Sequence, residues 1–307
     1  ALETGDSLLA AKGTYALHGP VHMQVAARNF PARILTSVFG MEKAVVDAPI
    51  DFAAELSGTG DDLTADISAQ LNGGMINGVT FTSAYGLANV HDGIIHVNQA
   101  YISRDSYKAS ASGTIPVSAL SGGRTEESMD VTLKLDHAGL DALTFLTPLV
   151  KSAQGGIEGD LKLTGTLAAP VLKGSLGVQN GIIQFQKVRY PLNNVNGTLH
   201  FNGSDMTISV SGTMDKKGKK NPGSVSIQAD AGWDGRQLSH YDGTIDMDHL
   251  LIDCDYFKGP LTGHLALSKE DYAPKISGIA EISDTVLDIP LALTSASEPP
   301  DVELDFT

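Results

Sequence analysis

A repeat with a spacing of about 104 residues is the strongest constraint on the fold of this chain. The run 159–183 matches the run 263–287 at seven glycine, proline or aliphatic positions, and no gap is needed. A looser copy lies at 87–90, which matches 192–195. Self-similarity of this kind indicates an array of stacked units. We expect one continuous elongated body, with a first repeat at 1–137, a second at 138–243 and a partial third at 244–307.

Each repeat is expected to consist of β-strands, because its apolar residues alternate with polar ones. In the run 160–167, Leu161, Leu163 and Leu167 fall on one side of a strand, and the polar residues fall on the other. The pairs Asn180–Gly181 and Asn202–Gly203 predict hairpin turns between such strands. The fold class is therefore mostly β.

Two segments break this alternation and predict short helices, near 31–46 and near 140–151. The first has Pro31 in its first turn, and the second has Asp141 as its expected N-cap. Two short helices cannot cover the apolar face of so long a sheet, and an uncovered apolar face is unstable in water. The residues leave three solutions open: a sandwich, a β-helix with a filled core, or a sheet curled into a trough that shelters apolar ligands.

Four glycines lie on the expected inward face of the second repeat: Gly165, Gly174, Gly197 and Gly212. Glycine inside a strand marks a bend or bulge, or leaves room for another group. The bend is the favoured interpretation, because a curled sheet needs bends, and the two interpretations are compatible.

Composition excludes several classes of protein. A net charge of −15 and a pI near 4.8 argue against nucleic acid as a partner and against tight docking on an anionic membrane. The single cysteine, Cys254, cannot form a disulfide within the chain. No apolar stretch is long enough to span a bilayer, and residues 1–7 lack the features of a signal peptide. Because the chain does not begin with Met, we expect it to be a piece of a longer protein.

The run 159–208 resembles the TamB family of the AsmA-like superfamily. The resemblance lies in a G-x-L-x-L-x-G-x-L strand at 159–167, a P-x-L-x-G-x-L strand at 170–176, and an L-x-x-V-x-G-x-L-x-F pair at 192–201. The run 263–290 repeats the first half of this pattern. The order and repetition of these motifs, rather than any single one, make the match specific.

This resemblance implies an elongated repetitive β-sheet curled into an open apolar groove, a β-taco, with one or two short helices. Members of the family look like non-enzymatic bridges in the periplasm of two-membrane bacteria, anchored in the inner membrane. They partner an Omp85-type outer-membrane barrel protein, through parts outside this sequence. They are linked to phospholipid transport between the membranes and to outer-membrane protein assembly.

The expected groove presents a continuous apolar floor to phospholipid acyl chains. Burial of one methylene group contributes roughly 0.8 kcal/mol, so a 16-carbon chain gains on the order of 12 kcal/mol. The charged headgroup must stay in water. The residues expected to line the groove are Leu161, Leu163, Leu167, Leu172, Leu176, Val178, Ile183, Phe185, Leu199, Phe201, Met206, Ile208, Val210, Leu265, Leu267 and Ile276.

No catalytic residues, metal site or cofactor are expected. The nine histidines are scattered, and His18 and His22 are separated by Gly19–Pro20. The acidic residues Asp246, Asp248, Asp253 and Asp255 near His249 do not have the spacing of a calcium loop, so a solvated strand face is the favoured interpretation. The basic cluster at 216–220 is expected to be a solvated hairpin tip, with phosphate attraction at the groove rim as the alternative.

Three functions remain open. The first is a lipid conduit. The second is a chaperone-like factor that assembles outer-membrane proteins such as autotransporters by adding their strands to an exposed sheet edge. The third is a structural stalk or adhesin with a filled, dry interior.

Overall fold

The computed structural model describes residues 2–16, 19–38, 45–59, 62–76, 78–105, 107–121, 126–166, 168–214, 222–234, 237–253, 257–269, 275–283 and 286–287. Nearly all of this part of the chain is β-strand. Within the described residues, helical structure is limited to α1 (Ala32–Val38), α2 (Leu143–Leu146) and the 3-10 turns η1 (Val117–Ser121) and η2 (Leu140–Ala142). The prediction of a mostly β fold with two short helices is confirmed, and both helices are shorter than predicted.

One sheet of 18 strands contains almost every strand. Its strands are β1 (Leu2–Thr4), β2 (Ser7–Tyr15), β3 (Pro20–Pro31), β5 (Pro49–Thr59), β6 (Asp62–Leu71), β9 (Ser83–His91), β10 (Ile94–Arg104), β11 (Tyr107–Pro116), β12 (Ser128–Gly139), β13 (Val150–Thr166), β14 (Pro170–Phe185), β15 (Leu192–Gly203), β16 (Asp205–Met214), β17 (Gly223–Asp234), β18 (Gln237–Asp253), β19 (Phe257–Lys269), β20 (Lys275–Ile282) and β21 (Val286–Leu287). The short strands β4 (Val46–Asp47), β7 (Gly74–Ile76) and β8 (Val79–Phe81) form a second, small sheet.

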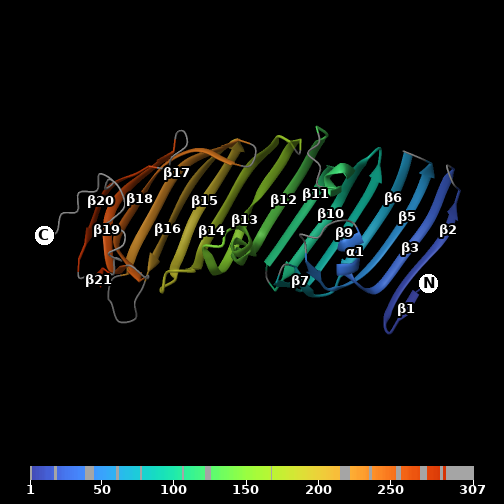
Figure 1. Ribbon diagram of the computed structural model, residues 1–307, viewed down its shortest axis with the longest axis horizontal. Helices are drawn as coiled ribbons and strands as arrows, with labels where there is room; N and C mark the ends of the chain where they lie inside the picture. The colour runs from blue at the N-terminus through green and yellow to red at the C-terminus, as the bar shows by residue number, and fades with distance from the viewer. Residues whose placement is uncertain are drawn as a thin grey trace, which may run out of the picture.

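The strands of the main sheet pair in chain order, and every pairing is antiparallel. The result is one long meander that runs from the N-terminal strand to the C-terminal strands (Figure 1). At its C-terminal end, β20 and β21 both pair with β19. This order needs only local connections, which antiparallel hairpins supply.

Apolar residues form continuous rows across the strands on one face of the sheet. Residues in one row are direct partners on neighbouring strands, so their side chains point the same way. The Leu161 row, which crosses β2 to β18, consists of Leu9, Ala27, Phe52, Ala69, Gly86, Ala100, Ala111, Leu133, Leu161, Gly174, Phe201, Met206, Ala231 and Tyr241.

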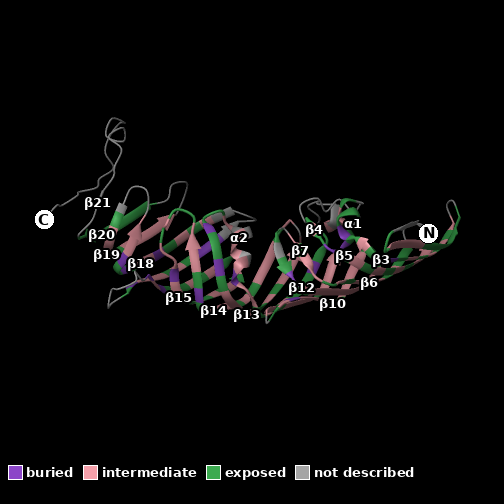
Figure 2. Cartoon of the chain, turned by 90° about the horizontal axis from the view of Figure 1, so that it is seen from below, coloured by how far each residue is buried: buried purple, intermediate pink, exposed green. Residues whose placement is uncertain are grey.

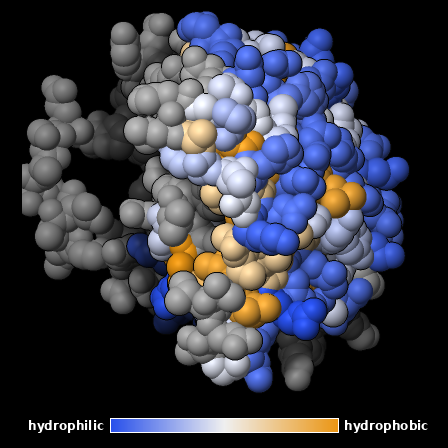
Figure 3. All heavy atoms as spheres, turned by 90° about the vertical axis from the view of Figure 1, so that its right-hand side faces the viewer, coloured by the Kyte–Doolittle hydropathy of each residue, from blue (hydrophilic) through white to orange (hydrophobic). Residues whose placement is uncertain are grey.

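The neighbouring row continues this face to the last strands of the sheet. The Leu176 row, which crosses β3 to β20, consists of Phe30, Ile50, Leu71, Ala84, Ile102, Ala109, Leu135, Gly159, Leu176, Leu199, Ile208, Ala229, Gly243, Leu267 and Ile276. We call this side of the sheet the apolar face. Seen from the N-terminal end, hydrophilic residues cover one flank of the molecule, and hydrophobic residues gather in the middle of the view (Figure 3).

The opposite, polar face carries rows of the other kind. One of them, three residues along the strands from the Leu161 row, consists of Lys12, Gln24, Glu55, Asp66, Asn89, His96, Thr114, Asp130 and Thr164. Another passes from Lys134 through Ser175 and His200 to Asp230. The period-two alternation of the sequence therefore sorts the side chains between the two faces over the whole described sheet.

Elements that cover the apolar face leave the sheet along one of its two long sides. We call this the cover side, where β3, β6, β12, β14 and β18 end. Here α1 follows β3, η2 and α2 follow β12, and the loop 186–191 follows β14. Figure 2 shows α1, β4, β7 and α2 on the same side of the sheet. The other long side, the hairpin side, has short turns such as Asp92–Gly93 and Gly203–Ser204.

Three of the four predicted inward glycines, Gly165, Gly174 and Gly197, lie where an added Cβ would meet a backbone oxygen of a neighbouring segment of the chain. That these glycines bend the sheet remains a prediction. Gly174 has a φ of +126°, and a Cβ there would lie 2.1 Å from the backbone oxygen of Asp160. At Gly212 the nearest atom to an added Cβ is Cγ of Leu192, at 2.8 Å. The space above Gly212 is thus filled by the chain's own side chain.

Two local predictions were wrong. Asn180–Gly181 is not a hairpin turn, because β14 continues through it to Phe185 and its register shifts there. Asn180 takes the left-handed conformation, with a φ of 52°, that lets Asn form a bulge inside a strand as readily as a turn. A tight turn is confirmed next to Asn202–Gly203, but it lies one residue later, at Gly203–Ser204, since Asn202 pairs with Asp205.

Asp141 is not the N-cap of a helix. Gly139 occupies that position before η2, with no side-chain hydrogen bond, and Asp141 lies inside η2. Its carboxylate faces Arg104 instead, at the end of β10. A tertiary partner thus outweighs the local capping preference.

Candidate functional site

The described residues of the predicted groove lie on one face of the sheet. Leu161, Phe201 and Met206 share one cross-strand row, and Leu176, Leu199, Ile208, Leu267 and Ile276 share the next. Leu163 pairs with Leu172, and Val178, Val210 and Leu265 belong to a further row. Ile183 and Phe185 lie near the cover side. Leu167 is outside the described residues, and the lipid-binding role of the whole set remains a prediction.

This apolar face has two different environments. Near the cover side it is packed by the chain itself, in a buried cluster of Leu192, Val195, Met214, Met247 and Leu250. Farther along the strands, Leu161, Leu163, Leu172, Leu176 and Leu199 are only half-buried. The first environment is an ordinary core, and the second keeps apolar surface accessible.

The residues predicted to line the groove all lie between Leu161 and Ile276, so that prediction left out the N-terminal half of this face. There the Leu161 row is built mainly of small residues, Ala69, Gly86, Ala100 and Ala111, between a few larger ones such as Phe52. Small residues give a weak hydrophobic signal. The alternation was nevertheless present in the sequence of β6, where Asp66 and Ser68 separate Ala65, Ile67 and Ala69.

Two arginine–aspartate pairs hold the cover elements in place. Arg104 of β10 donates a hydrogen bond to Asp141 of η2, and both side chains are about three-quarters buried. In the loop 186–191, the backbone N–H of Arg189 donates to the backbone oxygen of Asp253 over 2.9 Å, and its guanidinium lies 3.5 Å from the Asp253 carboxylate. The second contact links the end of β14 to the end of β18.

The hydrogen bond that Arg104 donates to Asp141 raises the pKa of the guanidinium above its usual range. Arg104 also lies over the ring of Tyr107, 5.2 Å from its centroid. When the pKa of a basic group is higher in the folded state than in the unfolded state, its charge stabilises the fold. This stabilisation is complete at any pH below the pKa of the unfolded state, and it is lost only as the pH rises through the pKa of the folded state. The Arg104 charge is therefore present throughout the neutral and acidic range.

Leu140 anchors the second cover element. It is 2% exposed, it packs with Val150 and Ala153, and its Cδ2 lies 2.8 Å from where a Cβ of Gly181 would be. We expect Leu140→Ala to lower the free energy of unfolding by about 3 kcal/mol, because the cavity beneath it cannot close fully. Leu149, which is 69% exposed, provides the control. Leu149→Ala should change the free energy of unfolding by about 0.5 kcal/mol or less. Equal effects in denaturant titrations would contradict this placement of η2.

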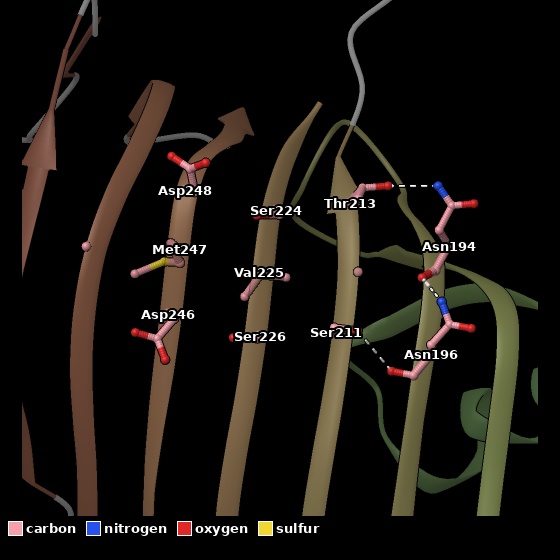
Figure 4. Close-up of a pocket in the computed structure, with 12 residues that line it drawn as sticks. Asn194, Asn196, Ser211, Thr213, Ser224, Val225, Ser226, Asp246, Met247 and Asp248 are labelled. Atoms are coloured by element: carbon pink, nitrogen blue, oxygen red, sulfur yellow. Dashed lines mark hydrogen bonds between the residues drawn. The ribbon is translucent and has the colours of Figure 1, made fainter. Parts of the chain in front are cut away.

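The polar face has shallow depressions. One, of about 410 Å³, is lined by residues of β15 to β19, most of them polar, together with Val225 and Met247 (Figure 4). Asn194 donates to Thr213 over 3.0 Å, and Asn196 donates to the backbone oxygen of Asn194 over 2.7 Å. These polar groups bond to one another, and the depression lies outside the predicted groove, on the polar face.

The acidic residues near His249 form separate pairs. The Oδ1 atom of Asp246 is hydrogen-bonded to Nδ1 of His264 over 2.6 Å, and Oδ1 of Asp248 is hydrogen-bonded to Nδ1 of His249 over 2.5 Å. Asp253 contacts Arg189 at the cover side, and Asp255 is outside the described residues, as are His18 and the basic cluster at 216–220. Within the described ranges, no three His, Cys, Asp or Glu side chains are grouped as a metal site would need. None of the helices in these ranges has the length and hydropathy to cross a bilayer.

Comparison with known proteins gives a partial match. No protein-family model and no solved structure matches the chain. It is 33% identical over 93 residues to the chloroplastic protein TIC236 of Arabidopsis thaliana. The match covers 29% of this chain and 4% of that protein, so the chain spans a small fraction of its relative's length. TIC236 is TamB-like, and this weak, partial similarity loosely supports the TamB resemblance of the sequence.

Proposed function

We propose that this chain is a non-enzymatic segment of a periplasmic bridge that binds phospholipid acyl chains on its apolar face. In this proposal the sheet curls into an open groove, and lipid moves along it between the inner and outer membranes of a two-membrane bacterium. The complete protein is anchored in the inner membrane and reaches an Omp85-type barrel through other parts. The partial similarity to a TamB-like chloroplast protein is consistent with a role in an envelope.

One observation carries this proposal: apolar rows cross nearly the whole sheet, and much of their central part is half-buried rather than packed. Strands about 4.8 Å apart make the described sheet roughly 80 Å long. Apolar surface of this extent is rare on a soluble protein unless it binds something. An acyl chain fits because it is apolar throughout and needs no single deep pocket.

The curl is supported by contacts that bring distant strands together. The bond between Arg189 and Asp253 joins β18 to the loop that leaves β14, across the three intervening strands. Close-approach glycines such as Gly174 favour local bends. Bulges with left-handed residues, at Asn180, Asn194 and His249, bend strands near the cover side.

Lipid extraction tests the proposal directly. The segment is purified from a two-membrane bacterium without detergent, and bound lipid is extracted and identified by mass spectrometry. We expect phospholipid to copurify in near-stoichiometric amounts, and a β-sheet protein of similar size from the same cells, without an apolar face, to carry only background. Lipid at background level in both samples would refute the proposal.

The second candidate function, strand addition to nascent outer-membrane proteins, has one specific observation in its favour. All eight residues of β20 are exposed, including Ile276 at 69% and Ile279 at 74%. Among the described residues, β20 pairs only with β19. A photocrosslinking residue at position 279 would capture unfolded barrel protein if this edge accepts strands. Equal capture from position 230, on an inner strand, would count against strand addition.

A further inference from the structure

The two long sides of the sheet differ in the region from β14 to β18. On the cover side the apolar residues are sealed: Leu192, Val195, Met214 and Leu250 are each between 3% and 8% exposed. Toward the hairpin side the same strands carry half-buried apolar residues, among them Leu199, Phe201 and Met206. Along β15 and β16, burial therefore decreases from the cover side to the hairpin side. In β17 it does not, because Ala231 near the hairpin side is only 5% exposed.

Side chains and a backbone contact both maintain the seal. Val188 and Tyr190 of the loop 186–191 pack on the buried cluster, and Arg189 bonds to Asp253. Beside them, Leu140 of η2 covers Gly181. To close this side, a segment of the chain must leave the sheet, cross the apolar face and return to the sheet.

The hairpin side has no such segment between β15 and β16. The connection there is a tight turn at Gly203–Ser204, in which Asn202 pairs directly with Asp205. Asn202, Ser204 and Asp205 are exposed, and Ser204 bonds to the neighbouring Asp205. The turn is polar and hydrated, and the apolar residues Phe201 and Met206 lie immediately inside it.

From this asymmetry, and resting on the proposed function, we infer that phospholipids bind between β14 and β16 with their headgroups along the hairpin side, at Ser204, and their acyl chains directed toward the cover side. A headgroup at the cover side would displace packed apolar side chains and lose water without a partner. At the hairpin side it stays hydrated while its chains cover half-buried residues. Lipid enters and leaves this region sideways, along the hairpin side only.

Two single-cysteine variants test the orientation. In a Cys254→Ser background, Ser204→Cys marks the hairpin side and Lys187→Cys marks the cover side. Both positions are exposed, so a fluorophore should not disturb the fold. The 12 residues of β15 separate the two sides by roughly 35 Å, beyond the short range over which a nitroxide quenches fluorescence.

The variants are loaded with phospholipid that carries a nitroxide on its headgroup or at the end of an acyl chain. We expect the headgroup nitroxide to quench the label at 204 and leave the label at 187 unquenched, while the chain-end nitroxide quenches 204 less than the headgroup nitroxide does. Equal or reversed headgroup quenching at the two positions, with lipid bound, would overturn the orientation and leave lipid binding intact. If neither lipid quenches either label and neither copurifies, the proposed function itself fails.

Discussion

Gly174→Ala is expected to lower the free energy of unfolding by about 2–4 kcal/mol. The φ of +126° is a region that an L side chain enters only with strain, at a cost of about 1–3 kcal/mol. The new Cβ would also lie 2.1 Å from the Asp160 oxygen and 3.0 Å from the Cα of Leu161. Because these are backbone atoms, the neighbouring strand must shift and weaken a ladder hydrogen bond, at a further cost of about 1 kcal/mol. Denaturant titration of the two proteins measures the difference.

Gly86 is the matched control, because it lies in the same Leu161 row on β9. A Cβ at this position would have nothing within 4 Å. Gly86→Ala should therefore change the free energy of unfolding by less than about 1 kcal/mol, with a gain expected from the less flexible unfolded chain. Similar losses in both variants would mean that glycine is needed for a general property of the row, not for the close approach at Gly174.

Leu176→Arg is expected to lower the affinity for lipid at least tenfold, which corresponds to about 1.4 kcal/mol of binding free energy. Leu176 is half-buried in the middle of the Leu176 row, between Gly159 and Leu199. A guanidinium there must either lose water beneath the acyl chains or push them away. Without lipid, the long side chain can reach water across the accessible face, so we expect the fold to survive with a loss of about 1 kcal/mol. Lipid copurification and denaturant titration measure the two effects.

Ser175→Arg provides the control, since Ser175 is the adjacent residue, is exposed and belongs to the polar face. It adds the same charge to the same strand and should leave both lipid binding and stability unchanged. If Leu176→Arg unfolds the chain while Ser175→Arg does not, the interior is a filled, dry core. That result would support the structural stalk and exclude the conduit.

The faces of the strands could be predicted from the sequence, because side-chain alternation is a local property of an extended chain. Leu161, Leu163 and Leu172 were assigned to one side from their spacing alone, and the observed pairing places them there. The tight turn next to Asn202–Gly203 was equally local. The antiparallel meander follows from such turns, since each short connection makes consecutive strands neighbours.

The failures have a common physical cause. Asn180 lies in a bulge and not in a turn, and the two cases differ only in whether a neighbouring strand continues to pair beyond it. Asp141 bonds with Arg104, which is 37 residues away in the chain, so its local preference for an N-cap was outweighed. In both cases the outcome depends on a partner that no short window of sequence contains.

Local alternation was thus enough to establish that the chain has an apolar face and which residues of β13 and β14 belong to it. It carried no information about which part of that face is covered. That part depends on where η2 and the loop 186–191 return to the sheet, and on the bonds from Arg104 to Asp141 and from Arg189 to Asp253. These contacts form between residues far apart in the chain, so the sealed and the accessible long side exist only once the sheet is assembled.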